Sequence, residues 1–178
     1  HISIPIENEL SEIIVPTIKM FLKDNFISFD DISFLAVGCG PGSFTGIRAI
    51  ISTALGITVS KSHIKSIGIN SLAGLAMSAL QEAKTLKVKY VISSIDSKKD
   101  DLFLQLFKIN YTKNKLLPIV AISNIDTIKI EKLKNYFMLH NLIFKEVLFF
   151  GHQSDMAKNI IENLNVSKSS TQYPNSLG

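Results

Sequence analysis

The chain has 178 residues, of which 46% are hydrophobic and 19% charged, and its formal net charge is +4. This length and apolar content suffice for a folded core, in one domain or in two small lobes. Every apolar run is much shorter than the roughly 18 residues of a membrane-spanning helix, so we expect no membrane role. Scattered lysines indicate solvated surfaces rather than a nucleic-acid-binding patch. A single cysteine, Cys39, excludes an internal disulfide and suits a reducing cytoplasm.

Hydrophobic periodicity predicts alternating strands and helices along the first half of the chain. Strands are expected where short apolar runs occur, and helices where apolar residues recur every three or four positions. Ser43 or Thr45 is a candidate cap for the second helix. The expected elements are a strand at 2–6, a helix at 10–22, a strand at 34–37, a helix at 45–60, a strand at 66–69 and a helix at 72–80.

The polar segment 81–89 predicts the boundary between two lobes, residues 1–86 and 87–178. A β-hairpin should open the second lobe, because two apolar runs flank a short polar turn. Helices and further strands should complete it, and the tail from Val166 reads as loop. The expected elements are strands at 90–95, 102–109, 117–122 and 147–150, and helices at 128–137 and 155–164.

Four of the nine glycines lie between Gly38 and Gly46, where a strand is expected to turn into a helix. Such a loop could cradle a phosphate at the start of the helix. It lacks the Gly-Lys-Ser/Thr ending of a P-loop and the spacing of a dinucleotide-binding loop. A tight turn packed closely on the helix explains the glycines equally well. Arg48, the one arginine in the chain, indicates a forked contact that lysine cannot copy.

Residues able to bind a metal show no recognisable spacing. The four histidines are far apart in the sequence, and none lies three or four residues from another. Asp96 at a predicted strand end could be a metal-linked carboxylate or an acceptor for turn N–H groups. We therefore assign no catalytic, cofactor-binding or metal-binding residue from the sequence.

The segment Gly40-Pro41-Gly42-Ser43-Phe44-Thr45-Gly46-Ile47-Arg48 resembles the signature of the TsaB (YeaZ) family, bacterial subunits for tRNA threonylcarbamoyladenosine biosynthesis. Three further segments resemble the family in the same order: 13–16, 67–72 and the hairpin segment 95–98, in which Lys98 replaces the family's arginine. The resemblance is clear over about residues 8–110 and holds only in outline beyond them.

The resemblance implies an α/β, two-lobed actin-like ATPase (ribonuclease-H-like) fold. Family members begin with an Ile-Asp-Thr strand and a second strand before the position that corresponds to His1. The first lobe is therefore expected to lack its opening strands, as in an N-terminally truncated chain. Such a lobe would expose an unpaired sheet edge.

The resemblance also implies a non-catalytic scaffold subunit that pairs with TsaD, its catalytic paralogue, and with the ATPase TsaE. The assembly transfers a threonylcarbamoyl group onto the adenosine adjacent to the anticodon of tRNA. ATP and metal are then expected in the partner subunits, with none intrinsic to this chain, and tRNA contact is indirect. Formation of a homodimer by this chain remains an open alternative. Rival interpretations are an independent actin-fold phosphotransferase and a glycoprotease-like peptidase; TsaD's His-x-x-x-His pair is missing here.

The helices at 10–22 and 45–60 are expected to pack side by side and to offer apolar faces to the partner. The residues expected to bind the partner are Ile14, Ile18, Phe21, Gly42, Phe44, Thr45, Gly46, Arg48, Ile51 and Ala54.

Overall fold

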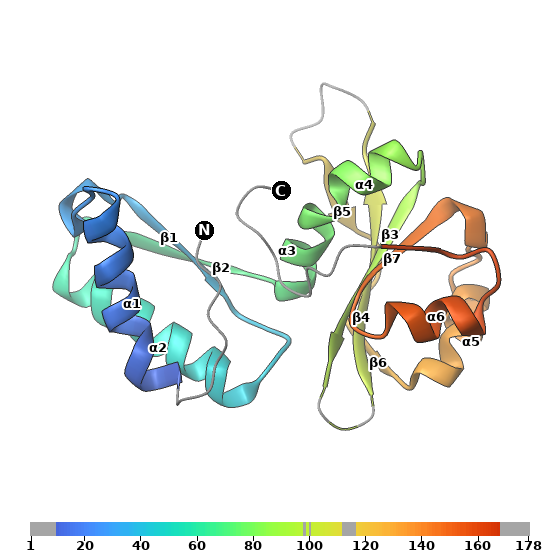
Figure 1. The fold of residues 1–178 in the computed structure, drawn as a ribbon, viewed down its shortest axis with the longest axis horizontal. Helices are drawn as coiled ribbons and strands as arrows, with labels where there is room; N and C mark the ends of the chain where they lie inside the picture. Colours follow the sequence, from blue (N-terminus) through green and yellow to red (C-terminus); the bar gives the residue numbers. More distant parts are fainter. Residues whose placement is uncertain (1–9, 98, 100, 112–116, 168–178) are drawn as a thin grey trace. The chain divides into compact units, whose positions relative to one another are not determined.

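A computed structural model describes residues 10–97, 99, 101–111 and 117–167. The expected strand at 2–6 and Lys98 lie outside the described residues. Internal contacts divide the chain into two compact units between Asn70 and Ser71. Figure 1 labels the helices and strands and colours the chain by residue number. None of the helices in the described ranges has the length and apolar character needed to cross a bilayer.

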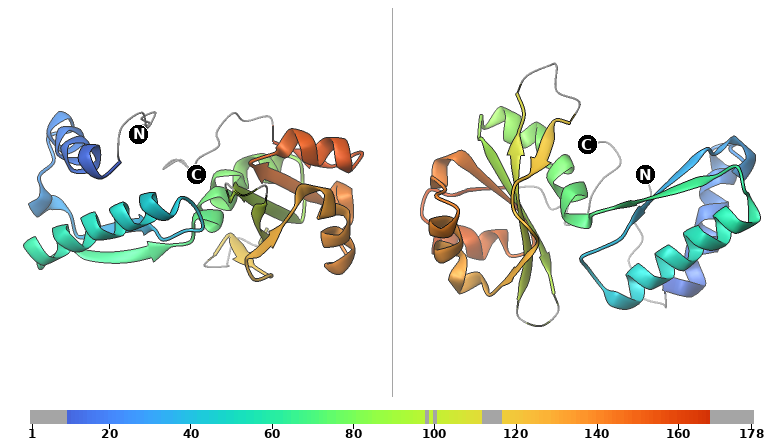
Figure 2. Two further views of the ribbon diagram at one scale, coloured as in Figure 1. Left: turned by 90° about the horizontal axis from the view of Figure 1, so that it is seen from below. Right: turned by 180° about the vertical axis from the view of Figure 1, so that it is seen from behind.

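The first unit contains two helices and a two-stranded parallel sheet. Strands β1 and β2 pair in register from Phe34 opposite Lys65 to Gly38 opposite Ile69. Helix α2 packs on both strands and α1 packs beside α2, as Figure 2 shows from two sides. The elements are α1 (Leu10–Asp24), the 3-10 turn η1 (Phe29–Asp31), β1 (Phe34–Gly38), α2 (Phe44–Ser60) and β2 (Lys65–Ile69). The helix–strand–helix–strand order predicted for this segment is confirmed.

The second unit is built on a mixed sheet with helices on both faces. Its strands follow the order β5-β4-β3-β7-β8, and β6 also pairs with β4. The pairing of β3 is antiparallel with β4, as expected for a hairpin, and parallel with β7. The elements are α3 (Ser71–Ser78), α4 (Leu80–Thr85), β3 (Tyr90–Asp96), β4 (Leu102–Ile109), β5 (Ile119–Ala121), β6 (Asp126–Ile128), η2 (Ile130–Lys132), α5 (Leu133–Leu139), η3 (Phe144–Glu146), β7 (Val147–Gly151), α6 (Ser154–Ile160) and β8 (Asn165–Val166).

Strict alternation along the central strands divides the core of this unit between the two sheet faces. One face carries Leu104 and Phe149, which pack against α5 and α6. The opposite face carries Phe107 and Phe150, which pack against α3 and α4. Both core clusters therefore lie within the second unit.

The structure corrects several predicted boundaries. The polar segment 81–89 is not a plain linker, because α4 covers most of its first half and buries Ala83 in the core. The division by internal contacts falls between Asn70 and Ser71, before α3, and the lobe boundary expected at residue 86 stays a prediction. The helix expected at 128–137 begins only at Leu133, since the residues before it form β6 and a 3-10 turn. The last helix ends at Ile160 rather than at Leu164, and β8 (Asn165–Val166) includes Val166, where the loop was expected to begin.

A candidate partner-binding groove

The glycine loop fixes the start of α2 by packing against it. Gly40 has a φ of +98°, a conformation that favours glycine, and a Cβ there would lie 2.9 Å from Cδ1 of Ile47. The Ser43 hydroxyl caps the helix by accepting a hydrogen bond of 3.3 Å from the Gly46 amide. The peptide bond between Gly40 and Pro41 is cis. Close packing on the helix thus accounts for Gly40, as one of the two sequence interpretations expected.

One face of α2 is exposed along its whole length. Its exposed residues recur at helical spacing and include three large apolar side chains, with Phe44 74% and Val59 84% exposed. The Arg48 guanidinium lies over the Phe44 ring, with its carbon 5.1 Å from the ring centroid. We call this face the α2 stripe; it consists of Phe44, Arg48, Ser52, Leu55 and Val59. Exposed apolar surface of this kind is typical of an interaction site.

A groove runs beside the stripe, between α1 and α2. It consists of two hollows, of about 530 and 400 Å³, that share Thr53. The first hollow is lined by Ser11, Phe44, Thr45, Arg48, Ala49, Ser52 and Thr53. The second is lined by Val15, Lys19, Phe29, Thr53, Gly56, Ile57, Ser60 and Lys61. Half of the lining residues are small or bear a hydroxyl group, so the backbone of a bound helix could approach the groove closely there.

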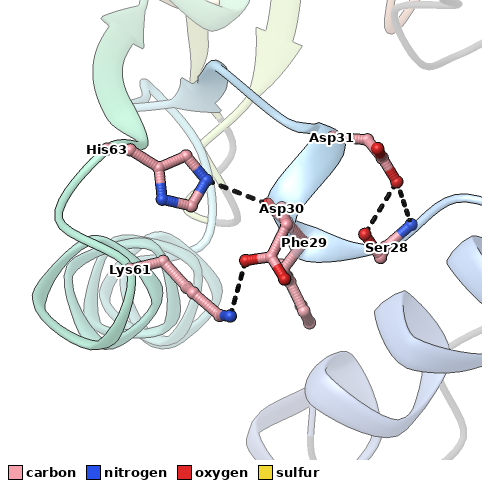
Figure 3. Close-up of polar contacts among 6 residues, drawn as sticks. All are labelled: Ser28, Phe29, Asp30, Asp31, Lys61 and His63. Carbon is pink, nitrogen blue, oxygen red and sulfur yellow. Dashed lines mark hydrogen bonds and ion pairs between the residues drawn. The ribbon is translucent and has the colours of Figure 1, made fainter.

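Polar contacts lie near the Lys61 end of the groove, and Figure 3 shows the residues that make them. The Lys61 ammonium pairs with the Asp30 carboxylate at 2.7 Å, and His63 Nε2 lies 3.3 Å from the Phe29 carbonyl oxygen. The hydrogen bond from Lys61 and its charge lower the pKa of Asp30. Hydrogen bonds from the Ser28 hydroxyl and amide likewise lower the pKa of Asp31. The Lys61–Asp30 and His63–Phe29 contacts join the segment after α1 to the segment after α2, whereas the Ser28–Asp31 hydrogen bonds lie within the segment after α1.

The structure distributes the predicted partner-binding residues unequally. It brings Phe44, Thr45 and Arg48 together in the first hollow. Ala54 is only 7% exposed, so its side chain packs inside the first unit and offers little surface to a partner. The half-buried members are Ile14, Ile18, Phe21, Gly42, Gly46 and Ile51. The partner-binding assignment as a whole stays a prediction.

The residues of this surface that were not predicted from the sequence include Lys19, Leu55 and Val59. Leu55 and Val59 lie four residues apart in an apolar helix, about one helical turn. That spacing places both on one face of the helix and could have indicated an apolar stripe. The sequence alone does not show which apolar face of α2 packs on the strands β1 and β2.

Metal-binding residues do not gather in the described ranges, where no group of three His, Cys, Asp or Glu side chains is placed to hold an ion. Asp96 is the last residue of β3 and pairs in register with Leu102 across the hairpin. The hydrogen bond of the Cys39 thiol goes to the Val37 carbonyl oxygen at 3.4 Å.

Comparison with known proteins gives consistent names. A family model described as "TsaD: tRNA N6-adenosine threonylcarbamoyltransferase" matches residues 6–175. Two Buchnera aphidicola proteins named "tRNA threonylcarbamoyladenosine biosynthesis protein TsaB" are 33% and 30% identical, over 57% and 71% of this chain. The Escherichia coli protein of that name is 30% identical over 53% of it. The matches span 42%, 60% and 39% of these relatives' own lengths.

Solved structures support the same fold. A structure titled "YeaZ from Pseudomonas aeruginosa" matches with a TM-score of 0.61 at 19% identity, covering 74% of this chain and 57% of that one. A second, titled as a protein similar to the peptidase YeaZ from that organism, matches with a TM-score of 0.62 at 16% identity, covering 87% and 67%. The predicted actin-like, ribonuclease-H-like α/β fold is thereby confirmed.

Proposed function

Because the chain belongs to the TsaD family, and five curated relatives carry the name TsaB, we propose that it serves in threonylcarbamoyladenosine formation on tRNA. Its role is that of a supporting, non-catalytic subunit that pairs with a TsaD-type catalytic paralogue and works with a TsaE-type ATPase. ATP and metal belong to those partners, tRNA contact is indirect, and the assembly acts in the cytoplasm.

The exposed α2 stripe is the observation that best supports pairing with a TsaD-type protein. It begins directly after the glycine loop, and it leaves Phe44 and Val59 mostly exposed. Burying such a side chain contributes about 1.5–3 kcal/mol, and several together can offset the entropic cost of association. A helix of the partner laid along this surface would supply that burial.

Two measurements test the proposal. The first is size-exclusion chromatography of the chain with the TsaD-type protein of the same organism. We expect co-elution, and we expect Val59→Glu to abolish it, because a carboxylate would be buried in an apolar interface. Val59 is mostly exposed in the free chain, so this change should not unfold it. The control is Lys134→Glu, a larger charge change on exposed surface of the second unit, which should leave co-elution intact.

The second measurement is nucleoside analysis of tRNA from cells depleted of this protein. We expect the amount of threonylcarbamoyladenosine in tRNA to fall. Expression of the unaltered protein, including any segments that adjoin this chain in the cell, should restore that amount. Unchanged modification together with absence of co-elution would contradict the proposal. Sustained ATP hydrolysis or zinc-dependent proteolysis by the purified chain alone would favour the rival interpretations.

A further inference from the structure

The second unit has a cavity of its own, where the edge of its sheet meets the end of α5. Its volume is about 530 Å³. The segment from β5 to β6 supplies most of the lining, and the last residue of α5 and its C-cap supply the rest. The lining includes Ile122, Ser123, Asn124, Asp126, Leu139 and His140. All of these residues belong to the second unit, whereas the α2 stripe belongs to the first.

The chain bulges away from the sheet on one side of this cavity. Strands β5 and β6 pair with two different stretches of β4, at 107–109 and at 102–104. Ser123 holds the segment between them, because its hydroxyl accepts the Leu106 amide at 3.0 Å and its carbonyl oxygen accepts Nε2 of Gln105 at 3.1 Å. Interrupted pairing of this kind turns side chains out of the regular pleat and is common beside binding sites.

Two polar side chains of the cavity can accommodate further hydrogen bonds. Nε2 of His140 is buried and has no partner among the described residues, which costs free energy. The His140 ring packs on the Tyr136 ring with centroids 4.5 Å apart, and the residue is half-buried. Burial, and after it the nearby Asp126 carboxylate, raise the pKa of Tyr136, so Asp126 belongs to the same cluster. A carboxylate has about four acceptor sites, and Asp126 can therefore accept hydrogen bonds from a ligand.

The charges of the lining favour a neutral ligand. Asp126 is acidic, and no lysine or arginine is among the described residues that line the cavity, so an anion would meet repulsion without a counter-charge. An ammonium group would be attracted to Asp126, but it only donates and cannot pair with His140 when Nε2 carries a proton. A hydroxyl group donates and accepts, and so it suits the carboxylate and either form of the imidazole.

We propose that this cavity binds a neutral, sugar-like ligand through two neighbouring hydroxyl groups. Both hydroxyls donate to Asp126, and one also pairs with Nε2 of His140 after a rotation of the imidazole ring. The C–H face of the ligand packs on Ile122 and Leu139, which are 48% and 76% exposed in the free chain. The diol belongs either to a free sugar or to the ribose of a nucleoside.

NMR titration of the full chain tests the proposal, with the His140 imidazole and the amides of 121–126 as reporters. We expect methyl β-D-ribofuranoside to shift these signals saturably at millimolar concentration, and its 2-deoxy analogue to bind about fivefold more weakly, since it lacks one hydroxyl of the diol. Uridine and 2′-deoxyuridine form the second pair of probes. Tighter binding of uridine than of the methyl riboside would identify a nucleoside as the source of the diol, and the reverse a free sugar. Saturable shifts with methylammonium alone, or with none of these probes, would overturn the proposal.

Variants of the lining locate the site. We expect Asp126→Asn to weaken binding about tenfold, because a charged acceptor is lost. Asp155→Asn makes the same change at an exposed position outside the cavity and should leave binding unchanged. Leu139→Ser should weaken binding about threefold, and because Leu139 is mostly exposed, this variant remains informative if Asp126→Asn fails to fold. Less than twofold change with every folded lining variant would overturn the proposal. These variants leave the first unit unaltered, so the pairing with the TsaD-type protein is tested separately.

Discussion

At the scale of single residues, Gly151 is the position where an added methyl group meets the strongest resistance. It ends β7 with a φ of +120°, and a Cβ there would lie 2.2 Å from the Ser94 carbonyl oxygen. That oxygen belongs to the neighbouring central strand and accepts the His152 amide at 3.1 Å. We expect Gly151→Ala to lower the free energy of unfolding by at least about 2 kcal/mol, from backbone strain and displacement of β3. Urea denaturation measures this, and an unchanged midpoint would contradict it.

Tyr136 provides a prediction for alkaline pH. Its hydroxyl is buried beside Ser123 at 3.3 Å, and burial, together with the Asp126 carboxylate, raises the pKa of Tyr136 to about 12, against the opposing hydrogen bond from Ser123. The corresponding value in an unfolded chain is 10.0. Between these values the unfolded chain loses the proton and the folded chain keeps it, so stability falls as pH rises.

The test compares the unaltered chain with Tyr136→Phe. The urea midpoint of the unaltered chain should decline more steeply from pH 10 to 12, because the variant has no proton to lose at this position. Equal slopes would show that the hydroxyl is not held in its neutral form by the fold.

At the scale of elements, α2 carries a glycine that the helix does not need for its shape. A Cβ on Gly56 would have no atom within 4 Å, so an alanine fits without rearrangement. Glycine inside a helix is less stable than alanine by about 0.5–1 kcal/mol. We expect Gly56→Ala to raise the free energy of unfolding of the first unit by about this amount. The measurement is chemical denaturation, with hydrogen exchange of the α2 amides as the readout for the first unit. A decrease would mean that the groove closes over this position.

The elements also show what the sequence can and cannot reveal. Strand β4 and the start of α2 were predictable, because alternation and the glycine motif are local patterns. Strand β6 was missed, since its three residues gain their conformation by pairing with Leu102–Leu104 of β4, which local periodicity does not encode. The α2 stripe was only partly predicted for a related reason. Which apolar residues of α2 stay exposed depends on which face packs on β1 and β2.

At the scale of the whole molecule, buried apolar side chains are unequally shared. In the described part of the first unit the buried hydrophobic residues are Leu22, Val37, Ala54 and Ile64, and both core clusters belong to the second unit. The parallel pair β1 and β2 leaves Phe34 66% exposed, whereas parallel sheets are normally covered on both faces. Hydrophobic burial dominates stability, so the first unit should be the less stable of the two.

Hydrogen exchange of the free chain should therefore proceed in two stages. Amides of β1, β2 and α2 should exchange first, through opening of the first unit, while those of β3, β4 and β7 should persist until global unfolding. Adding the TsaD-type partner should slow exchange in α2 most, because a ligand that binds only the folded form stabilises it by an amount that grows with the logarithm of the ligand concentration. The variant Val59→Glu should remove this protection and leave exchange of the second unit unchanged. Simultaneous exchange of the amides of both units would contradict this prediction, because it would show that the two units unfold as one.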